Sequence, residues 1–200
     1  MKNELIIHPL REEDFELASS FVYEGMHLYT YLSNEEHADD LRRGYFQRFA
    51  LTATYALGAY RNGTLVGFVM SEMDGKSPCF PILNKQTIFE MMERGFHGSR
   101  NENAARSYYQ ANEEMLKNSK HHFDGELTLL AVDPLHKREG IMTALFQQLS
   151  RDLHGKRVYL FTDSDCDTLF YPANGFEKEG EAQVDFPSKR LFCYMFSKLL

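Results

Sequence analysis

A short basic loop ahead of an amphipathic helix is the part of the sequence best suited to bind an anion. The apolar run Leu127–Val132 is followed by the basic triplet His136-Lys137-Arg138 and then by Gly140. From Ile141 onward apolar residues recur at helical spacing, so the loop leads into a helix N-terminus. Such a terminus presents unpaired backbone N–H groups and the positive end of the helix dipole. We therefore predict that amides between Arg138 and Thr143 bind a phosphate-bearing cofactor; a solvated basic turn is the alternative interpretation.

The elements that must position this loop alternate between strand and helix along the chain. Predicted strands cover Glu4–Pro9, Tyr55–Tyr60, Leu65–Met70, Glu126–Val132, Arg157–Thr162, Phe176–Val184 and Arg190–Lys198. Predicted helices cover Arg11–Gly25, a segment that follows Ser33 or Asn34 as N-cap, Lys85–Arg94, Asn103–Asn118, Gly140–Leu153 and a short stretch near Asp167–Ala173. The pair Asn62-Gly63 predicts a hairpin between the second and third strands. This mixture predicts an α/β fold with helices on both faces of a central sheet.

With these elements in order, the chain resembles the GNAT superfamily of N-acetyltransferases, which use acetyl-CoA. The strand, loop and helix over Val132–Leu145 are similar to the family's pyrophosphate-binding motif. The segment Phe170-Tyr171-x-x-x-Gly175-Phe176 resembles the family's tyrosine and Gly-Phe ending. The motif departs from the family at Lys137, where Arg or Gln is preferred, and at Met142, where Gly or Ala is preferred. The resemblance implies a GNAT-like mixed sheet flanked by helices.

The same resemblance implies where acetyl-CoA, the cosubstrate, binds. Residues expected to pair with its pantetheine arm or to bind its pyrophosphate are Leu130, Ala131, Val132, Lys137, Arg138, Glu139, Gly140, Ile141, Met142 and Thr143. Ser164 joins this set because it stands where the family often has an asparagine that touches the pantetheine arm.

Acetyl transfer to an amine requires a base and an acid. A lysine-like amine has a pKa near 10.4, so only about one molecule in 10³ is free at pH 7, and a carboxylate or a water chain must remove its proton. Glu126 is the nearest match to the family's frequent base position, with Asp163 and Asp165 as alternatives. Tyr171 is expected, from the family motif, to protonate the departing thiolate; a structural core tyrosine is the alternative.

Composition restricts the class of protein. The formal net charge of -7 argues against broad nucleic-acid binding, which requires a basic surface. No signal-like N-terminal run and no stretch of about 18 apolar residues is present, so we expect no membrane association. Three cysteines without C-x-x-C spacing are typical of a reduced, cytoplasmic protein. The histidines lack metal-ligand spacing, and the His121-His122 pair is interpreted as a polar loop, so no metal is predicted.

The sequence thus predicts an N-acetyltransferase that transfers acetyl from acetyl-CoA to a primary amine of a small molecule or peptide in a ternary complex. A non-catalytic acyl-CoA-binding sensor or interaction module is the alternative. We expect one domain over residues 1–200, with a helical insertion at about 79–123 before the cofactor-binding strand. We hypothesise that this insertion shapes the acceptor pocket through Phe96, Tyr108 and Tyr109. The apolar segment Arg190–Phe196 suits either an interior strand or a homodimer interface.

Overall fold

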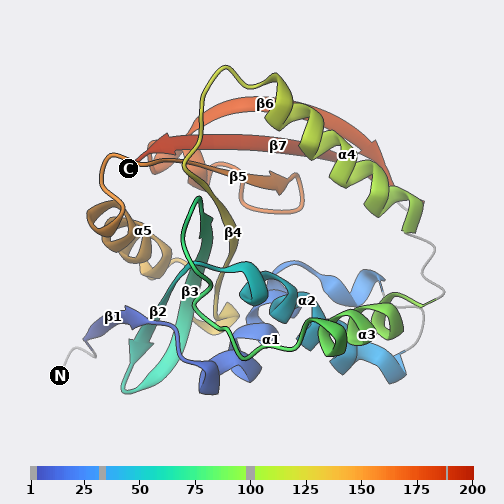
Figure 1. Cartoon of the computed structure of the whole chain (residues 1–200), viewed down its shortest axis with the longest axis horizontal. Coiled ribbons are helices and arrows are strands. Elements are labelled where there is room, and N and C mark those ends of the chain that lie inside the picture. Colours follow the sequence, from blue (N-terminus) through green and yellow to red (C-terminus); the bar gives the residue numbers. More distant parts are fainter. Residues whose placement is uncertain (1–3, 32–34, 98–101, 188) are drawn as a thin grey trace.

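A computed structural model describes residues 4–31, 35–97, 102–187 and 189–200, and within these residues seven strands form one sheet (Figure 1). The strands are β1 (Leu5–Pro9), β2 (Tyr55–Arg61), β3 (Thr64–Met73), β4 (Gly125–Val132), β5 (Arg157–Asp163), β6 (Glu177–Asp185) and β7 (Arg190–Leu199). Their order across the sheet is β1-β2-β3-β4-β5-β7-β6. Neighbouring strands pair antiparallel, except that β4 and β5 are parallel. The predicted mixed sheet is confirmed.

Six α-helices lie within the described residues. They are α1 (Phe15–Gly25), α2 (Ala38–Thr52), α3 (Lys85–Phe96), α4 (Glu102–Asn118), α5 (Ile141–Asp152) and α6 (Phe170–Ala173). None of them combines the length and the apolar character that crossing a membrane requires. The expected N-cap of the second helix, Ser33 or Asn34, lies outside the described residues. That helix begins at Ala38, after a 3-10 turn over Glu35–His37.

The two faces of the sheet bury different residues of the same strands. On one face Tyr60 and Phe68 pack with α1 and α2, and on the other face Val66 and Val69 pack with α5. Figure 1 shows α5 on the opposite side of β3 and β4 from α2. Successive side chains of a strand point to opposite faces, as Phe68 and Val69 do, and the register shift that leaves Val66 without a pairing partner on β2 puts Val66 on the face of Val69. The prediction of helices on both faces is therefore confirmed.

The β2–β3 hairpin closes as its turn residues predict. Asn62 and Gly63 have φ values of 50° and 81°, both in the left-handed region that a two-residue hairpin turn of this type requires. Asparagine and glycine tolerate that region better than other residues.

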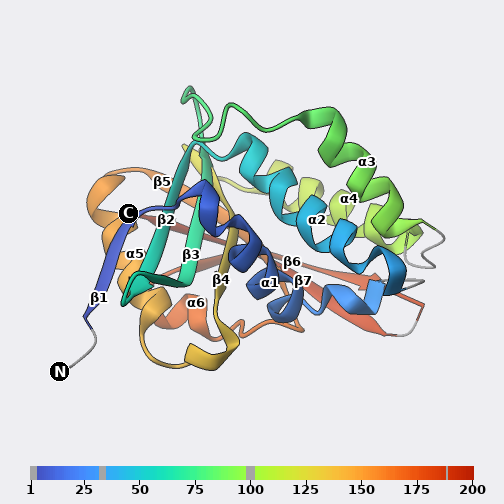
Figure 2. The ribbon, with the colours of Figure 1, turned by 90° about the horizontal axis from the view of Figure 1, so that it is seen from below.

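The segment at 79–123 supplies two helices that pack in different places. Helix α3 lies beside α2 (Figure 2), so closely that a Cβ atom on Gly95 would meet the Leu41 Cα at 2.7 Å. Helix α4 packs on β6 and β7, where Met115 is buried with Val184 and Met195. Each helix therefore contributes to a hydrophobic cluster as well as to the surface.

Strands β4 and β5 are paired only at their beginnings. The paired positions are Gly125 with Val158 and Glu126 with Tyr159, and the strands then diverge (Figure 1). Beyond this point the edge of β4 that faces β5 has no strand partner in the described part of the chain, while its other edge continues to pair with β3. The sheet is thus open between its two halves.

Candidate active site

A cavity of approximately 1230 Å³ occupies the opening between β4 and β5. Its walls come from α1, α2, α4, β4, the end of β5, α6 and the start of α5. Predicted cofactor-binding and catalytic residues share this one space. Those that line it are Glu126, Leu130, Ala131, Val132, Lys137, Arg138, Gly140, Ile141, Met142, Thr143 and Tyr171.

The loop before α5 presents backbone amides to the cavity. Gly140 is the N-cap residue with φ 77°, and Arg138 also has a positive φ, of 66°. The Ala144 amide donates to the Gly140 carbonyl at 3.0 Å, which closes the first turn. The amides of that turn, up to Thr143, consequently have no acceptor within the helix. They form a donor set that suits the diphosphate of a nucleotide-type cofactor.

Two members of the predicted cofactor set do not line the cavity. Glu139 forms an ion pair with Arg61 and contacts the His136 Nδ1 at 3.3 Å. The Ser164 amide donates to the Phe192 carbonyl at 2.9 Å, and the Ser164 hydroxyl accepts from the Phe192 amide at 3.2 Å. Contact of either residue with the cofactor stays a prediction that this geometry does not support.

Strand pairing places Glu126 between two polar neighbours. Glu72 on β3 and Tyr159 on β5 are its register partners, so all three side chains lie on the same face of the sheet. The Tyr159 hydroxyl donates to Glu126 Oε2 at 3.2 Å. Burial raises the pKa of Glu126 to about 7, and the nearby charge of Glu72 acts in the same direction. A carboxyl group with such a pKa can take up and release a proton near neutral pH.

Glu126 also borders a second, smaller pocket of approximately 390 Å³. The other polar residues that line it are Glu72, Asp74, His121, His122 and Tyr159. The Glu126 carboxyl group thus lies between the large cavity and the smaller polar pocket. A proton that it takes up from the large cavity can be passed to the polar groups of the smaller pocket.

Tyr171 is both a core residue and a cavity residue. The ring is 6% exposed and stacks on Phe196 with 5.3 Å between centroids. Burial raises the pKa of its phenol, so the hydroxyl is protonated at neutral pH and is available as a donor. The ring is held by the turn that follows, in which the Phe176 amide donates to the Tyr171 carbonyl at 3.1 Å.

The two alternative bases differ in their surroundings. Asp163 and Asp165 both line the cavity. Burial raises the pKa of Asp163, whereas Asp165 forms an ion pair with Lys189. Asp165 therefore already has a cationic partner, and Glu126 and Asp163 are the carboxyl groups whose environment suits proton transfer.

Three cavity residues were missed by sequence reasoning. Arg48 on α2 donates to the Tyr109 hydroxyl on α4 at 2.6 Å, and Tyr159 binds Glu126 as described. Asn112 on α4 is 7% exposed, and its Oδ1 has no hydrogen-bond partner in the described part of the chain. A charged residue directly before Phe49 on an amphipathic helix is a weak signal for Arg48. Nothing in the sequence marks Asn112.

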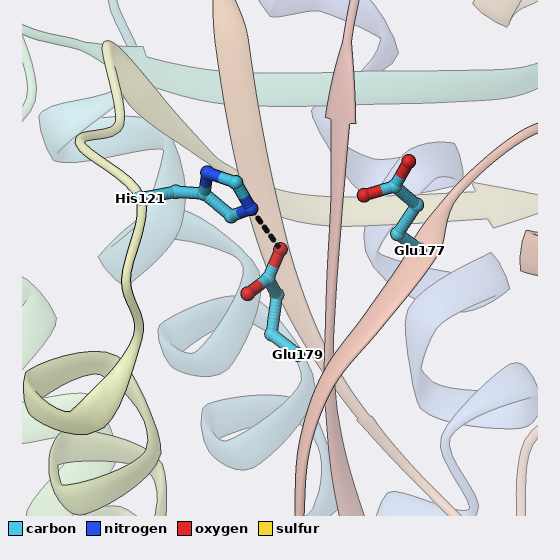
Figure 3. A group of neighbouring side chains, drawn as sticks. All are labelled: His121, Glu177 and Glu179. Atoms are coloured by element: carbon cyan, nitrogen blue, oxygen red, sulfur yellow. Dashed lines mark ion pairs between the residues drawn. The ribbon is translucent and has the colours of Figure 1, made fainter.

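His121, which lines the smaller pocket, belongs to a group of three possible metal ligands (Figure 3). His121, Glu177 and Glu179 bring their ligand atoms within 4.8 Å of one another. His121 Nε2 lies 3.6 Å from Glu179 Oε1, which also accepts from the Ser197 hydroxyl at 2.5 Å. Since the Glu179 oxygens already accept hydrogen bonds from Ser119 and Ser197, we assign these contacts to a polar cluster between an exposed histidine and a largely buried glutamate, and we derive no metal chemistry from them.

Comparisons with known proteins bear on this geometry. The sequence model of the acetyltransferase (GNAT) family matches residues 19–176. No curated protein matches the sequence. Solved structures are similar over nearly the whole chain, at identities that show the fold alone.

One similar structure is a Corynebacterium glutamicum protein described as histone acetyltransferase HPA2 and related acetyltransferase. It has a TM-score of 0.61 and 13% identity, and the match covers 96% of this chain and 94% of that one. A putative arylalkylamine N-acetyltransferase from the mosquito Aedes aegypti gives a TM-score of 0.59 at 15% identity, with 97% and 86% covered. PaiA N-acetyltransferase from Thermoplasma acidophilum, solved with coenzyme A, gives 0.54 at 16% identity, with 98% and 99% covered.

Proposed function

The chain belongs to the acetyltransferase (GNAT) family, and on that premise we propose that it transfers the acetyl group of acetyl-CoA to a primary amine in a direct ternary complex. The acceptor is an amine of a small molecule or a peptide. One observation carries this proposal. The unpaired edge of β4, the α5 amides, Glu126 and Tyr171 all face one cavity.

The residues present fit a CoA thioester. Amides of the first turn of α5 and the side chains of Lys137 and Arg138 suit the diphosphate. The free edge of β4 at Leu130–Val132 suits the amide groups of a pantetheine arm, which can pair with it as an added strand would. When bound, acetyl-CoA supplies an acetyl thioester whose carbonyl carbon accepts the amine.

Glu126 serves as the general base in this proposal. Its carboxylate takes a proton from the ammonium form of the acceptor, so the nitrogen gains a free lone pair. The pKa near 7 makes about half of these carboxyl groups ionised at neutral pH. The second pocket, with its histidines and carboxylates, provides a polar environment into which the proton is passed on.

Tyr171 serves as the general acid. After the amine nitrogen forms its bond to the carbonyl carbon and the carbon–sulfur bond breaks, the phenol donates its proton to the departing sulfur. The second proton that the nitrogen releases on forming the amide then restores the phenol. Its raised pKa keeps the phenol protonated until that step. Thr162 interacts with this hydroxyl, an interaction that lowers the pKa and therefore offsets part of the effect of burial.

A non-catalytic acyl-CoA sensor remains the second candidate, and one observation favours it. Met142 lines the cavity where the family prefers glycine or alanine, so its side chain occupies space near the predicted diphosphate site. Calorimetric titration with acetyl-CoA and thiol release with a panel of amines separate the two functions. Turnover that is lost in Glu126→Gln supports the enzyme. Tight binding without turnover for any amine supports the sensor, and absence of binding contradicts both.

A further inference from the structure

We propose that the acceptor amine also carries a carboxylate, which is bound by the guanidinium of Arg48. This inference rests on the proposed acetyl transfer and names the class of acceptor. The relevant part of the cavity, here called the acceptor side, is bounded by α2, α4 and Glu126 and lies away from the α5 loop.

Arg48 is a cation in a half-buried position, and it forms no ion pair with the residues that the structure describes. Its Cζ lies 5.1 Å from the centroids of both the Phe49 and the Tyr109 rings, and its Nη1 donates to the Tyr109 hydroxyl at 2.6 Å. Among the residues that the structure describes, no carboxylate forms an ion pair with it. Charges removed from water are usually paired, so this guanidinium lacks the partner that its position calls for.

The neighbours of Arg48 on its own helix provide a contrast. Arg42 and Arg43 both form ion pairs with Glu16. Arg48 instead lines the cavity and lies over two aromatic rings, those of Phe49 and Tyr109. A planar guanidinium held in this way suits bidentate binding of a carboxylate.

The amine end of such a substrate also has partners in the cavity. The positive charge of Arg48 lowers the pKa of Glu126, but among the described residues the two groups form no ion pair. A molecule with an ammonium group and a carboxylate can bridge them, with the ammonium at Glu126. Asn112 lines the same cavity from α4, between Tyr109 and Leu116.

Electrostatics favours a monoanion in this place. On the acceptor side, Arg48 is the only arginine or lysine among the described lining residues, because Lys137 and Arg138 belong to the α5 loop. Glu113, Glu126 and Asp163 line the same cavity. These carboxylates repel a dianion, and they attract the ammonium group of an aminocarboxylate. The aromatic walls, including Tyr108 and Phe161, suit an apolar body between its two charged ends.

The test uses matched pairs of amines that differ by one carboxylate. Phenylalanine is compared with phenethylamine, β-alanine with ethylamine, and 6-aminohexanoate with pentylamine, all by thiol release with saturating acetyl-CoA. In at least one pair we expect kcat/KM for the amino acid to exceed that for the plain amine by about tenfold or more, as charge-assisted hydrogen bonds of ordinary strength would give. Equal or better use of the plain amine in every pair would overturn the inference and leave the proposed acetyl transfer standing.

Two Arg48 variants, with Arg43→Gln as their control, test whether the preference for the amino acid depends on Arg48. In Arg48→Gln the KM of the preferred amino acid should rise roughly tenfold to a hundredfold, and its kcat/KM should fall by about that factor more than kcat/KM of its plain amine, because any change in the pKa of Glu126 affects both substrates alike. Arg43→Gln removes a neighbouring charge that pairs with Glu16 and should leave both substrates unchanged. Arg48→Lys keeps the charge but loses the planar fork, so an intermediate loss is expected even where the glutamine variant folds poorly. An unchanged preference in both Arg48 variants would contradict the assignment.

Binding without chemistry provides an independent readout. Hexanoate and 3-phenylpropionate carry the carboxylate but no amine, and calorimetry measures their affinity for the CoA-bound protein. We expect weak binding of at least one of them that Arg48→Gln abolishes and Arg43→Gln retains. Absence of such binding overturns the inference even if no amine is turned over, whereas failure of acetyl-CoA itself to bind overturns the proposed function.

Discussion

Glu126 shows how strand pairing sets the acidity of a single side chain. Its register partners, Glu72 and Tyr159, come from positions far apart in the sequence, and burial among them raises its pKa to about 7. A carboxyl group whose pKa is raised on folding binds more protons in the folded state than in the unfolded one. Its contribution to stability is therefore complete below about pH 4.5 and is lost as the pH rises toward 7.

Glu126→Gln should separate activity from stability. We expect kcat/KM of the wild-type protein to rise with pH up to about 7, and the variant to lose this step together with most of its turnover. At pH 8 the variant should be more stable by about 3 kcal/mol, because no buried charge is formed, and at pH 4 the two proteins should match. Urea unfolding at both pH values measures this. A variant that is less stable at pH 8 would contradict the raised pKa.

Tyr171→Phe should reduce turnover and spare cofactor affinity. Removal of the phenol leaves the ring stacked on Phe196 but eliminates the proton donor, so we expect kcat to fall about tenfold to a thousandfold. The affinity for acetyl-CoA should stay within about twofold by calorimetry. Tyr55→Phe is the matched control, since its hydroxyl binds Asp152 and it does not line the cavity. Equal losses of turnover and affinity would identify Tyr171 as a purely structural residue.

At the scale of elements, the start of α5 depends on one backbone conformation. Gly140 has φ 77°, and a Cβ atom placed there would meet nothing within 4 Å. The glycine is therefore required by its left-handed conformation and not by crowding in the structure itself. Any further requirement for a small residue would come from a ligand that approaches the amides.

Gly140→Ala should consequently weaken acetyl-CoA binding. A non-glycine residue in the left-handed region costs about 1–2 kcal/mol, and a shift of the amides to relieve it would lower affinity roughly tenfold. Gly63→Ala is a matched control, because Gly63 has φ 81° and equally open surroundings but lies in the β2–β3 hairpin. Both variants should lose similar stability in urea unfolding, and only Gly140→Ala should lose affinity in calorimetry. Equal affinities in the two variants would mean that this loop is not the diphosphate site.

The packing of α3 on α2 has a different glycine requirement. Gly95→Ala would place its Cβ 2.7 Å from the Leu41 Cα, so the helices must separate, at a cost of about 1–3 kcal/mol. Gly25→Ala, near the end of α1, meets nothing within 4 Å and should be neutral or slightly stabilising. Denaturant midpoints of the two variants provide the measurement, and a neutral Gly95→Ala would mean that the close approach is not fixed.

At the scale of the whole molecule, the order of elements could be predicted because it depends on local patterns. Apolar periodicity and the Asn62-Gly63 and Gly140 positions indicate where strands, the hairpin and α5 begin and end, and the structure agrees within a few residues. The loop that we predict to bind the cofactor was found from the same local signals. Catalytic roles came from family resemblance instead, since a lone tyrosine such as Tyr171 has no distinctive spacing.

The rest depends on contacts between distant segments, which no local pattern encodes. Register alone puts Glu126 opposite Tyr159, and the divergence of β4 from β5 is a property of the whole sheet. The sequence of the 79–123 segment does not indicate that α3 packs on α2 while α4 packs on β6 and β7. Arg48 and Asn112 face the cavity for the same reason: two helices from different parts of the chain enclose it.

The divergence of the strands leads to a prediction for the entire sheet. If the β4 edge that faces β5 receives the pantetheine arm, amide hydrogen exchange along Leu129–Val132 should slow when acetyl-CoA is added, at alternate residues, because only alternate amides point toward that edge. Amides of Ile141–Thr143 should slow as well, since they would donate to the diphosphate. The β1–β2 pair, which is hydrogen-bonded already, should exchange at an unchanged rate and provides the internal control. Uniform slowing of exchange across the sheet would indicate general stabilisation by the ligand. Slowing confined to α4 would place the ligand on the acceptor side of the cavity. Either pattern would contradict binding along the opening between β4 and β5.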